Sequence, residues 1–509
     1  MITVRPGFAE LSSLDVHPPS VRLLPRAFCR RAGVFVAGVV DPLGKDPVVL
    51  GMAHPDDVAA AELAARMLGR PVEVVRLTRY EVDRAVTLGF DGVAALGVEG
   101  AGRVVALPVA EPGPGSSASD LLDHVLADAV AAGASDIHLE TYAHDVDVRF
   151  RVDGMLRQTF TQVTPANVAE VVSRVKVLAG LDIAERLRAQ DGRFRVTFTR
   201  GETPRAVDFR VSVVPSPAGE DVVMRILDAS RGLLPLGGLG MAPDVLETWR
   251  RLVDNPEGLL LVTGPTGSGK TTTLYASLAA AVEDHRKIVT AEDPVEYVLD
   301  HVNQKQVTPH LAFADLLRAS LRQNPDVLLF GELRDRESVA TAAAAAATGH
   351  LVLSTLHTHD TVGVVPRLRG MGLEAVDVAE ALLGALAQRL VRAVCAGCAE
   401  DLAPTAAQRV LFGRLLDGRR FVAGRGCEAC RGTGYRGRFG VYELLVADTG
   451  FEDLVADGAP THELRAHARA RGQRTLADDA LDKAAAGRTT LDEVVRCVPY
   501  RQIVAVRDT

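Results

Sequence analysis

A glycine-rich run at residues 264–272 constrains this chain more than any other feature of its sequence. It follows an apolar stretch at residues 258–263 and precedes a segment that can start a helix. A strand, a glycine-rich loop and a helix N-terminus together direct backbone N–H groups and a positive dipole end at an anion. The residues expected to hold phosphates are Gly264, Pro265, Thr266, Gly267, Ser268, Gly269, Lys270, Thr271 and Thr272.

Two side chains of this run carry chemistry that a simple tight turn does not need. Lys270 supplies a point charge for β- and γ-phosphates, and Thr271 supplies the hydroxyl that a phosphate-bound Mg²⁺ takes as a ligand. A turn with a purely structural role is the alternative, and it explains neither residue. The run therefore predicts that the chain binds and hydrolyses a nucleoside triphosphate, ATP with Mg²⁺ being the usual pair.

The composition favours a soluble, globular protein. The chain has 509 residues, 47% of them apolar and 24% charged, which suggests roughly three domains that each bury a core. The net charge of −8 gives no electrostatic reason to expect a nucleic-acid partner. The longest apolar runs, such as residues 259–262 and 342–347, are too short to cross a membrane, and no N-terminal signal segment is apparent. We therefore expect a cytoplasmic protein.

Four of the six cysteines form two C-x-x-C pairs. They are Cys395, Cys398, Cys427 and Cys430. In a reducing compartment this pattern favours metal binding over disulfides, and four thiolates suit a closed, tetrahedral, structural Zn²⁺ site. An Fe–S cluster is the main rival, and unligated cysteines are the remaining alternative. The isolated Cys29 and Cys497 are expected to be small buried hydrophobes.

Breaks in composition divide the chain. A Pro/Gly/Ser-rich stretch at residues 111–117 interrupts all periodicity, and a glycine-rich connector occupies residues 235–240. From residue 241 onward, helical and buried-strand patterns alternate, which argues for βαβ units and a parallel sheet. The expected divisions are a small α/β domain at 1–110, a linker at 111–118, an α+β domain at 119–230, a linker at 231–240, an ATPase domain at 241–393, a tetracysteine module at 394–440 and a helical region at 441–509.

Acidic side chains follow two apolar strands of the ATPase block. Glu292 and Glu296 come after the apolar residues 288–290, and Glu332 ends the apolar run 327–330. Ligands of open α/β sheets bind at such strand ends, where acids hold Mg²⁺ through water or orient the attacking water. The alternative for the first pair is a solvated turn, because Asp-Pro within it is a turn signal.

Histidines stand at both ends of another apolar strand, with His350 before it and His357 after it. A lone histidine in this setting is more often a satisfied core residue. The polar strand end also fits a sensor of the γ-phosphate, and we carry His357 as a candidate site residue on that ground.

Four motifs resemble, in their order and spacing, those of secretion ATPases of the type II secretion and type IV pilus assembly family. They are the glycine-rich run, the acidic pair Glu292 and Glu296, the strand that ends before Glu332, and the strand between His350 and His357. The resemblance covers nearly all of the chain from about residue 118. Residues 134–140, 148–154 and 190–193 match the PAS-like domain of that family. The first block is similar to its weakly defined, partner-binding N-terminal domain through Leu24-Pro25 and residues 50–55. The resemblance implies a RecA-like ATPase domain preceded by a PAS-like domain and a small N-terminal α/β domain.

The family resemblance also implies a homohexameric ring with ATP between the PAS-like domain of one subunit and the RecA-like domain of the next. Arg210 and Arg225 match the family's arginines on the PAS-like side, which contact phosphates of the neighbouring subunit. Ordinary surface or ion-paired arginines are the alternative. The chain departs from the family at His359, where asparagine is usual, and at Asn324, where aspartate is more usual.

The tetracysteine module resembles that of assembly and secretion ATPases, whereas retraction ATPases generally lack it. We expect a cytoplasmic motor that couples ATP hydrolysis to pseudopilus assembly and protein export by a type II secretion system. Its partners would be inner-membrane platform proteins, through which it meets the membrane peripherally. Type IV pilus assembly is the alternative within the family. A nucleic-acid translocase is the alternative of another class, and the acidic net charge speaks against it.

Overall fold

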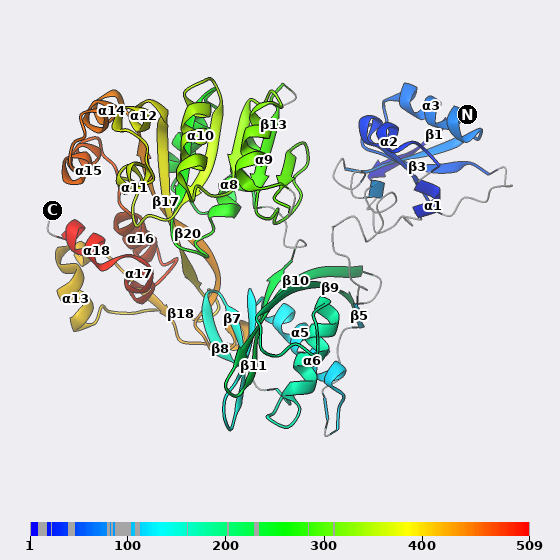
Figure 1. The fold of residues 1–509 in the computed structure, drawn as a ribbon, viewed down its shortest axis with the longest axis horizontal. Coiled ribbons are helices and arrows are strands. Elements are labelled where there is room, and N and C mark those ends of the chain that lie inside the picture. The colour runs from blue at the N-terminus through cyan, green and yellow to red at the C-terminus, as the bar shows by residue number, and fades with distance from the viewer. Residues whose placement is uncertain are drawn as a thin grey trace. The chain divides into compact units, whose positions relative to one another are not determined.

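The computed structural model describes residues 2–8, 18–21, 23–38, 46–78, 82, 85–86, 103–106, 112–113, 115–159, 161–200, 203–228, 234–282, 285–308 and 311–507. It divides into two compact units, the first made of residues 1–152 and 156–230 and the second of residues 153–155 and 231–509. Both units combine helices with sheets, so the predicted mixed α/β fold is confirmed (Figure 1). Within the described ranges, no helix is long and apolar enough to span a membrane.

The first unit begins with a four-stranded sheet of order β1-β4-β3-β2 (Figure 1, blue). Its elements are β1 (Ile2–Phe8), α1 (Pro18–Val21), α2 (Arg26–Ala32), β2 (Val34–Ala37), β3 (Val48–Met52), α3 (Val58–Leu68) and β4 (Val72–Arg76). Helix α3 begins at Val58 because Asp57 caps its N-terminus by accepting from the Ala60 backbone N–H, and Gly69 ends it in the left-handed region.

A seven-stranded sheet of order β5-β9-β10-β11-β6-β7-β8 forms the rest of the first unit. Its elements are β5 (Arg103–Ala106), α5 (Ala118–Ala132), β6 (Asp136–Thr141), β7 (Val146–Val152), β8 (Met155–Gln158), α6 (Val168–Ala179), β9 (Gln190–Arg200), β10 (Thr203–Ser216) and β11 (Gly219–Leu227). Alternate strand residues such as Phe194 and Phe209 pack with α5 and α6 in one buried cluster. Their neighbours, which include Arg210, point to the opposite face.

The second unit is built on a seven-stranded sheet of order β14-β13-β15-β16-β12-β17-β20. Its first elements are η4 (Leu236–Gly238), α7 (Pro243–Val253), β12 (Gly258–Thr263), α8 (Lys270–Ala281), β13 (Ile288–Glu292), β14 (Asn303–Gln306), α9 (Phe313–Leu321), β15 (Val327–Phe330), α10 (Arg336–Ala346), β16 (Leu351–Leu356), α11 (Val364–Gly370) and α12 (Ala375–Ala381). Strands β14 to β17 in this order pair in parallel, as the sequence predicted.

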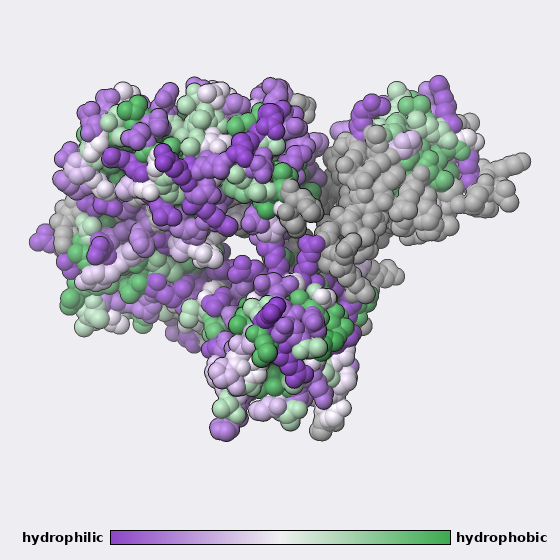
Figure 2. Space-filling model, viewed as in Figure 1, coloured by the Kyte–Doolittle hydropathy of each residue, from purple (hydrophilic) through white to green (hydrophobic). Residues whose placement is uncertain are grey.

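Both faces of this sheet are covered by helices, which explains the continuous apolar character of β12. Leu259 and Leu261 enter a cluster with α9, α10 and α12, whereas Leu260 and Val262 enter a second cluster with α7 and α8. On the face drawn in Figure 2, the second unit presents mainly hydrophilic side chains with apolar ones scattered among them.

A long antiparallel ribbon closes the sheet on one side. Its strands are β17 (Leu382–Val394) and β20 (Tyr435–Val446), and the tetracysteine module lies between them in sequence, with β18 (Ala399–Asp401), α13 (Ala406–Phe412), η5 (Gly413–Leu416), β19 (Val422–Gly424) and η6 (Glu428–Cys430). The remaining helices are α14 (Thr449–Ala456), α15 (Thr461–Ala470), α16 (Leu476–Ala485), α17 (Leu491–Cys497) and α18 (Tyr500–Arg507). Strand β20 thus crosses residue 441, where the sequence analysis began a helical region.

A buried ion pair holds this ribbon to the C-terminal helices. Glu493 is fully buried on α17. Its carboxylate accepts two hydrogen bonds from Arg392, one from the backbone N–H at 3.0 Å and one from Nε at 2.9 Å, and a third from Arg496 Nε at 2.8 Å. Burial alone raises the pKa of Glu493, but the hydrogen bonds from Arg496 and Arg392 outweigh it and lower the pKa to about 2.

We predict that Glu493→Gln lowers the unfolding free energy of the second unit by about 3 kcal/mol at pH 7, because it leaves the Arg392 guanidinium, only 13% exposed, without its charged partner. The native pKa lies below the ordinary 4.5, so the contribution of Glu493 is complete above pH 4.5 and is lost as the pH falls towards 2. Urea unfolding followed by the fluorescence of Trp249, the single tryptophan and a buried residue of this unit, measures the effect.

The matched control is Asp401→Asn. Asp401 pairs with Arg420, but both side chains are exposed, by 64% and 82%, so the loss should stay below about 1 kcal/mol. Equal losses in the two variants, or a Glu493→Gln loss that does not shrink below pH 4.5, would contradict the prediction.

Candidate functional site

Parallel pairing brings three predicted stretches to one edge of the second sheet. Strand β12 lies between β16 and β17, with Thr263 opposite Leu356 on one side and Ala387 on the other. Strand β15 follows β16, with Phe330 opposite Ser354. The glycine-rich run, Glu332 and His357 therefore leave the sheet at neighbouring carboxyl ends, where ligands of open α/β sheets bind. We call this region the loop edge, and the residues 264–269 within it the phosphate loop.

The phosphate loop has the shape of an anion cradle. Gly264, Gly267 and Gly269 all have positive φ, of 152°, 77° and 88°, and Gly269 caps the N-terminus of α8. A Cβ at Gly264 would lie 2.6 Å from the Gln388 carbonyl oxygen, so a larger residue does not fit. The Ser268 hydroxyl is buried and has no hydrogen-bond partner among the described residues. An orphaned hydroxyl beside a helix N-terminus fits a phosphate group.

Lys270 lies over this loop. Its Nζ donates to the carbonyl oxygens of Gly264 at 2.9 Å and Pro265 at 3.2 Å. Burial lowers the pKa of Lys270 to about 8; the Glu332 carboxylate opposes this shift and the Arg389 guanidinium adds to it. An anion that replaced the two carbonyl oxygens would raise this pKa again, so the geometry favours a negatively charged ligand.

Glu332 and His357 meet at the loop edge. The Nε2 atom of His357 lies 3.2 Å from Glu332 Oε1, and Arg334 Nε donates to Glu332 Oε2 at 3.0 Å. The Glu332 side chain is 27% exposed and that of His357 is 41% exposed, so both reach solvent. A partly exposed carboxylate that accepts from a guanidinium and lies beside an imidazole can orient a water molecule.

The structure places the two other acids differently. Glu292 is buried at the end of β13 and accepts from Thr290 Oγ1 at 2.6 Å, from Gln304 Nε2 at 3.2 Å and from the Tyr275 hydroxyl. Burial raises the pKa of Glu292, and these three hydrogen bonds oppose the shift. The Tyr275 hydroxyl also accepts from the Glu296 backbone N–H at 3.2 Å. Glu292 and the Glu296 backbone are thus hydrogen-bonded to Tyr275 of α8, the helix that follows the phosphate loop.

Sequence reasoning did not find this network. Tyr275 lies on α8 and Gln304 lies on β14, and neither residue belongs to a motif that indicates a functional site. The only signal was the position of Tyr275, about one helical turn beyond Thr271, which places it on the helix that starts at the loop.

The four paired cysteines come together. Their Sγ atoms all lie within 4.8 Å of one another, with 3.8 Å between Cys395 and Cys427, 3.8 Å between Cys398 and Cys430 and 3.7 Å between Cys427 and Cys430. Zn–S bonds of about 2.3 Å in a tetrahedron need S–S distances of about 3.8 Å. Backbone N–H groups of Cys427 and Gly434 point at the Cys430 sulfur and favour a thiolate. The donor set fits a four-coordinate metal ion.

The two isolated cysteines differ from each other. Cys29 is buried in the N-terminal domain, as predicted. Cys497 is half-buried, and its thiol donates to the Leu390 carbonyl oxygen at 3.3 Å.

Arg210 and Arg225 belong to the first unit and stand directly opposite each other on β10 and β11. Arg193 on β9 faces Arg210 from the other side, so three arginines form one row across the sheet. The Nε atom of Arg225 donates to Asp136 Oδ1 at 3.2 Å, while the Arg225 side chain remains 57% exposed. Like charges in directly opposed positions destabilise a sheet, so this row favours an anionic partner.

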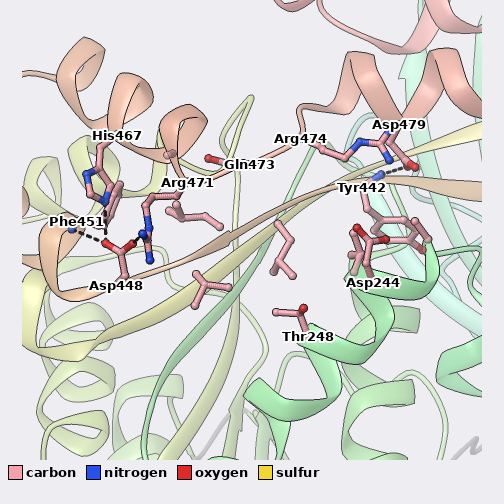
Figure 3. Close-up of a pocket in the computed structure, with 17 residues that line it drawn as sticks. Asp244, Thr248, Tyr442, Asp448, Phe451, His467, Arg471, Gln473, Arg474 and Asp479 are labelled. Atoms are coloured by element: carbon pink, nitrogen blue, oxygen red, sulfur yellow. Dashed lines mark hydrogen bonds and ion pairs between the residues drawn. The ribbon is translucent and has the colours of Figure 1, made fainter.

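A cavity of about 320 Å³ lies elsewhere in the second unit, among α7, β20, α14, α15 and α16. Figure 3 shows Asp448 at its wall, where it accepts from the Phe451 backbone N–H, from His467 and from Arg471. Asp479 accepts from the Tyr442 backbone N–H across the cavity. None of the residues named in the sequence analysis lines it, so no sequence motif indicated this cavity.

Comparison with known proteins agrees with the loop-edge geometry. The family model described as Type II/IV secretion system protein matches residues 115–496, and that of the MshEN domain matches residues 6–91. Type II secretion system protein E of Pseudomonas aeruginosa is 40% identical over 505 residues, 95% of this chain and 98% of that protein. Type II secretion system ATPase E of Vibrio cholerae is 46% identical over 379 residues, 74% of each chain. The type IV pilus assembly ATPase PilB of Thermus thermophilus is 39% identical over 495 residues, 94% of this chain but 54% of that protein.

Solved structures agree at the level of the fold. The pilus retraction motor PilT with bound ADP is 27% identical, with a TM-score of 0.50, and the match covers 74% of this chain and 96% of that one. The ATPase DotB of Legionella pneumophila has a TM-score of 0.57 at 21% identity, covering 79% and 100% of the two chains. The resemblance seen in the sequence is confirmed: the chain belongs to the type II/IV secretion system protein family.

Proposed function

We propose that this chain is the ATP-hydrolysing motor of a type II secretion system, and that it drives pseudopilus assembly as a homohexamer bound to inner-membrane platform proteins. The observation that carries the proposal is the loop edge, where parallel pairing aligns the phosphate loop with Glu332 and His357. The match to type II secretion system protein E along 95% of this chain supports the choice of secretion system.

In this proposal the phosphates displace the two carbonyl oxygens from Lys270, whose ammonium group then neutralises charge on the β- and γ-phosphates. The Thr271 hydroxyl would hold a Mg²⁺ ion, which would neutralise charge on the phosphoryl oxygens. Glu332, held by His357 and Arg334, orients water for in-line attack. Buried Glu292 positions α8 through Tyr275, and the carboxylate of Glu296, whose backbone N–H donates to the same hydroxyl, is the second candidate for orienting water.

Arg210 and Arg225 are proposed to contact the phosphates of the neighbouring subunit. Arg193, Arg210 and Arg225 stand in directly opposed positions on β9, β10 and β11, and this row of cations supports the proposed contact with an anion. The four clustered cysteines are proposed to hold a structural Zn²⁺ ion. The N-terminal domain is proposed to bind a platform partner.

Assembly of type IV pili is the second candidate, favoured by the 39% identity to PilB over 94% of this chain. A host strain that lacks the gene distinguishes the two. Loss of protein export into the medium supports secretion, whereas loss of surface pili with normal export supports the second candidate.

We predict that Lys270→Ala and Glu332→Gln each reduce ATP turnover of the purified hexamer to below about 1% of the wild-type rate, by removing charge neutralisation and water orientation respectively. Glu332→Gln should still bind ATP, because it leaves the phosphate loop intact. Steady-state phosphate release and equilibrium nucleotide binding measure the two effects. Normal turnover in Lys270→Ala would exclude the proposed site.

We further predict that the site is shared between subunits. Arg225→Gln and Lys270→Ala should each be inactive, yet a mixed ring should recover up to about a quarter of the wild-type rate, because some interfaces then combine an intact Lys270 with an intact Arg225. The control mixture is Lys270→Ala with Glu332→Gln: both residues lie on one unit of one chain, so no interface regains both. Recovery in the control mixture, or none in the test mixture, argues against sharing.

We predict one zinc ion per chain in protein purified under reducing conditions, measured by elemental analysis. Cys430→Ser should lose the metal and lower the melting temperature, because a structural site contributes its binding free energy to folding. Cys497→Ser, outside the cluster, should keep both. Iron with visible absorbance would indicate the rival Fe–S cluster, and a metal-free protein of unchanged melting temperature would exclude a metal site.

A further inference from the structure

The strand beside the phosphate loop runs past the point where the loop begins. Thr263, the last residue of β12, pairs with Ala387 of β17, so the next residue of β17, Gln388, stands level with Gly264. Strand β17 continues to Val394, whereas its parallel neighbour β12 ends at Thr263. Because side chains alternate along a strand, Gln388 and Arg389 point to opposite faces of the sheet at the loop edge.

The Gln388 side chain bridges the phosphate loop and helix α8. It is 1% exposed, its Nε2 donates to the Ser268 carbonyl oxygen at 2.6 Å, and its Oε1 accepts from Thr273 Oγ1 at 2.8 Å. Ser268 is in the loop and Thr273 is in the first turns of α8. One amide group therefore fixes the loop backbone relative to the helix whose N–H groups face the phosphates.

Strand β17 packs so closely against the phosphate loop that a side chain at Gly264 would clash and one at Gly269 would be crowded. A Cβ at Gly264 would come within 2.6 Å of the Gln388 carbonyl oxygen, and a Cβ at Gly269 would come within 3.1 Å of Gln388 Nε2. The loop glycines thus let the backbone approach β17, and Gln388 makes the hydrogen bonds that this approach permits.

Arg389 makes the corresponding link on the other face. It is 7% exposed, and its guanidinium donates to the Gln388 carbonyl oxygen at 2.9 Å and to the His359 carbonyl oxygen at 3.2 Å. No acidic side chain in the described part of the chain forms an ion pair with Arg389, so this buried guanidinium donates its hydrogen bonds to two backbone carbonyl oxygens. His359 belongs to the loop that follows β16 and carries His357, and Thr358 of that loop donates its N–H to Thr263 Oγ1 at 2.8 Å.

We propose that Gln388 and Arg389 are positioning residues for nucleotide hydrolysis: Gln388 sets the phosphate loop, Arg389 sets the histidine-bearing loop, and their adjacency on β17 fixes the two loops relative to each other. The inference rests on the proposed function. Gln388 then affects mainly the binding of the phosphates, because it positions the loop that holds them. Arg389 affects mainly the rate of hydrolysis, because displacement of a catalytic group by about 1 Å can lower the rate about 10²-fold.

The first test is Gln388→Leu, which keeps the side-chain bulk and removes both hydrogen bonds. We expect the KM for ATP and the Kd for ADP to rise at least about tenfold while kcat stays within about threefold. Gln388→Glu should bind ADP weakly at pH 8 and regain affinity as the pH is lowered, since the protonated carboxyl again donates to the Ser268 carbonyl oxygen.

Gln408→Leu is the matched control. Gln408 is also a buried glutamine that donates one hydrogen bond, to Asp492 Oδ1 at 2.8 Å, and accepts one, from the Thr405 backbone N–H at 2.8 Å, but it lies on α13 and touches neither loop. It should lower the melting temperature about as much as Gln388→Leu and leave KM and Kd within about twofold. Equal changes of KM in the two variants would reduce the role of Gln388 to stability.

The second test is Arg389→Lys, which keeps the charge but cannot span both carbonyl oxygens. We expect the opposite split, with kcat lowered about tenfold and KM within about threefold. The inference is overturned if Gln388→Leu leaves ADP affinity unchanged, or if Arg389→Lys changes KM and spares kcat. A wild-type protein that hydrolyses no ATP would instead overturn the proposed function, while ADP affinity still tests the Gln388 link.

Discussion

The position of β12 between β16 and β17 is the constraint on which the rest of the second unit depends. A parallel strand buried on both faces must be apolar throughout, so it carries no chemistry of its own. Chemistry is confined to its carboxyl end, where the phosphate loop meets polar groups from both neighbours. One register therefore determines which side chains can reach the loop, and a slip of one residue in β17 would put Ala387 or Arg389 in the place of Gln388.

Local patterns in the sequence predicted much of this site. The phosphate loop, Glu332 and His357 each mark the end of an apolar strand, and the C-x-x-C spacing predicted the cysteine cluster that the structure contains. The burial of Glu292 could not be predicted in the same way, because it depends on Tyr275 and Gln304, which reach it from other elements. Pattern shows where a strand ends, but not which side chains from other elements surround the residue that follows.

The β17–β20 ribbon shows the same limit at the level of the fold. The sequence analysis assigned no element to residues 382–392, although they form most of a 13-residue strand. Their partner, β20, lies beyond the whole tetracysteine module, so the pairing is non-local and leaves little trace in any short window of sequence. Cys395 directly follows β17, so the cysteine cluster is joined in sequence to the strand that contacts the phosphate loop.

A row of three arginines crosses the larger sheet of the first unit. Arg193, Arg210 and Arg225 occupy directly opposed positions on three adjacent strands, an arrangement that costs stability in an isolated domain. Asp136 offsets part of that cost at one end by accepting a hydrogen bond from Arg225 Nε, while the Arg225 side chain remains 57% exposed. An exposed guanidinium retains the capacity for a charge-assisted hydrogen bond with an anion. The proposed contact with a nucleotide phosphate would bring negative charge to this row of guanidinium groups, and its favourable Coulomb energy would then offset their mutual repulsion.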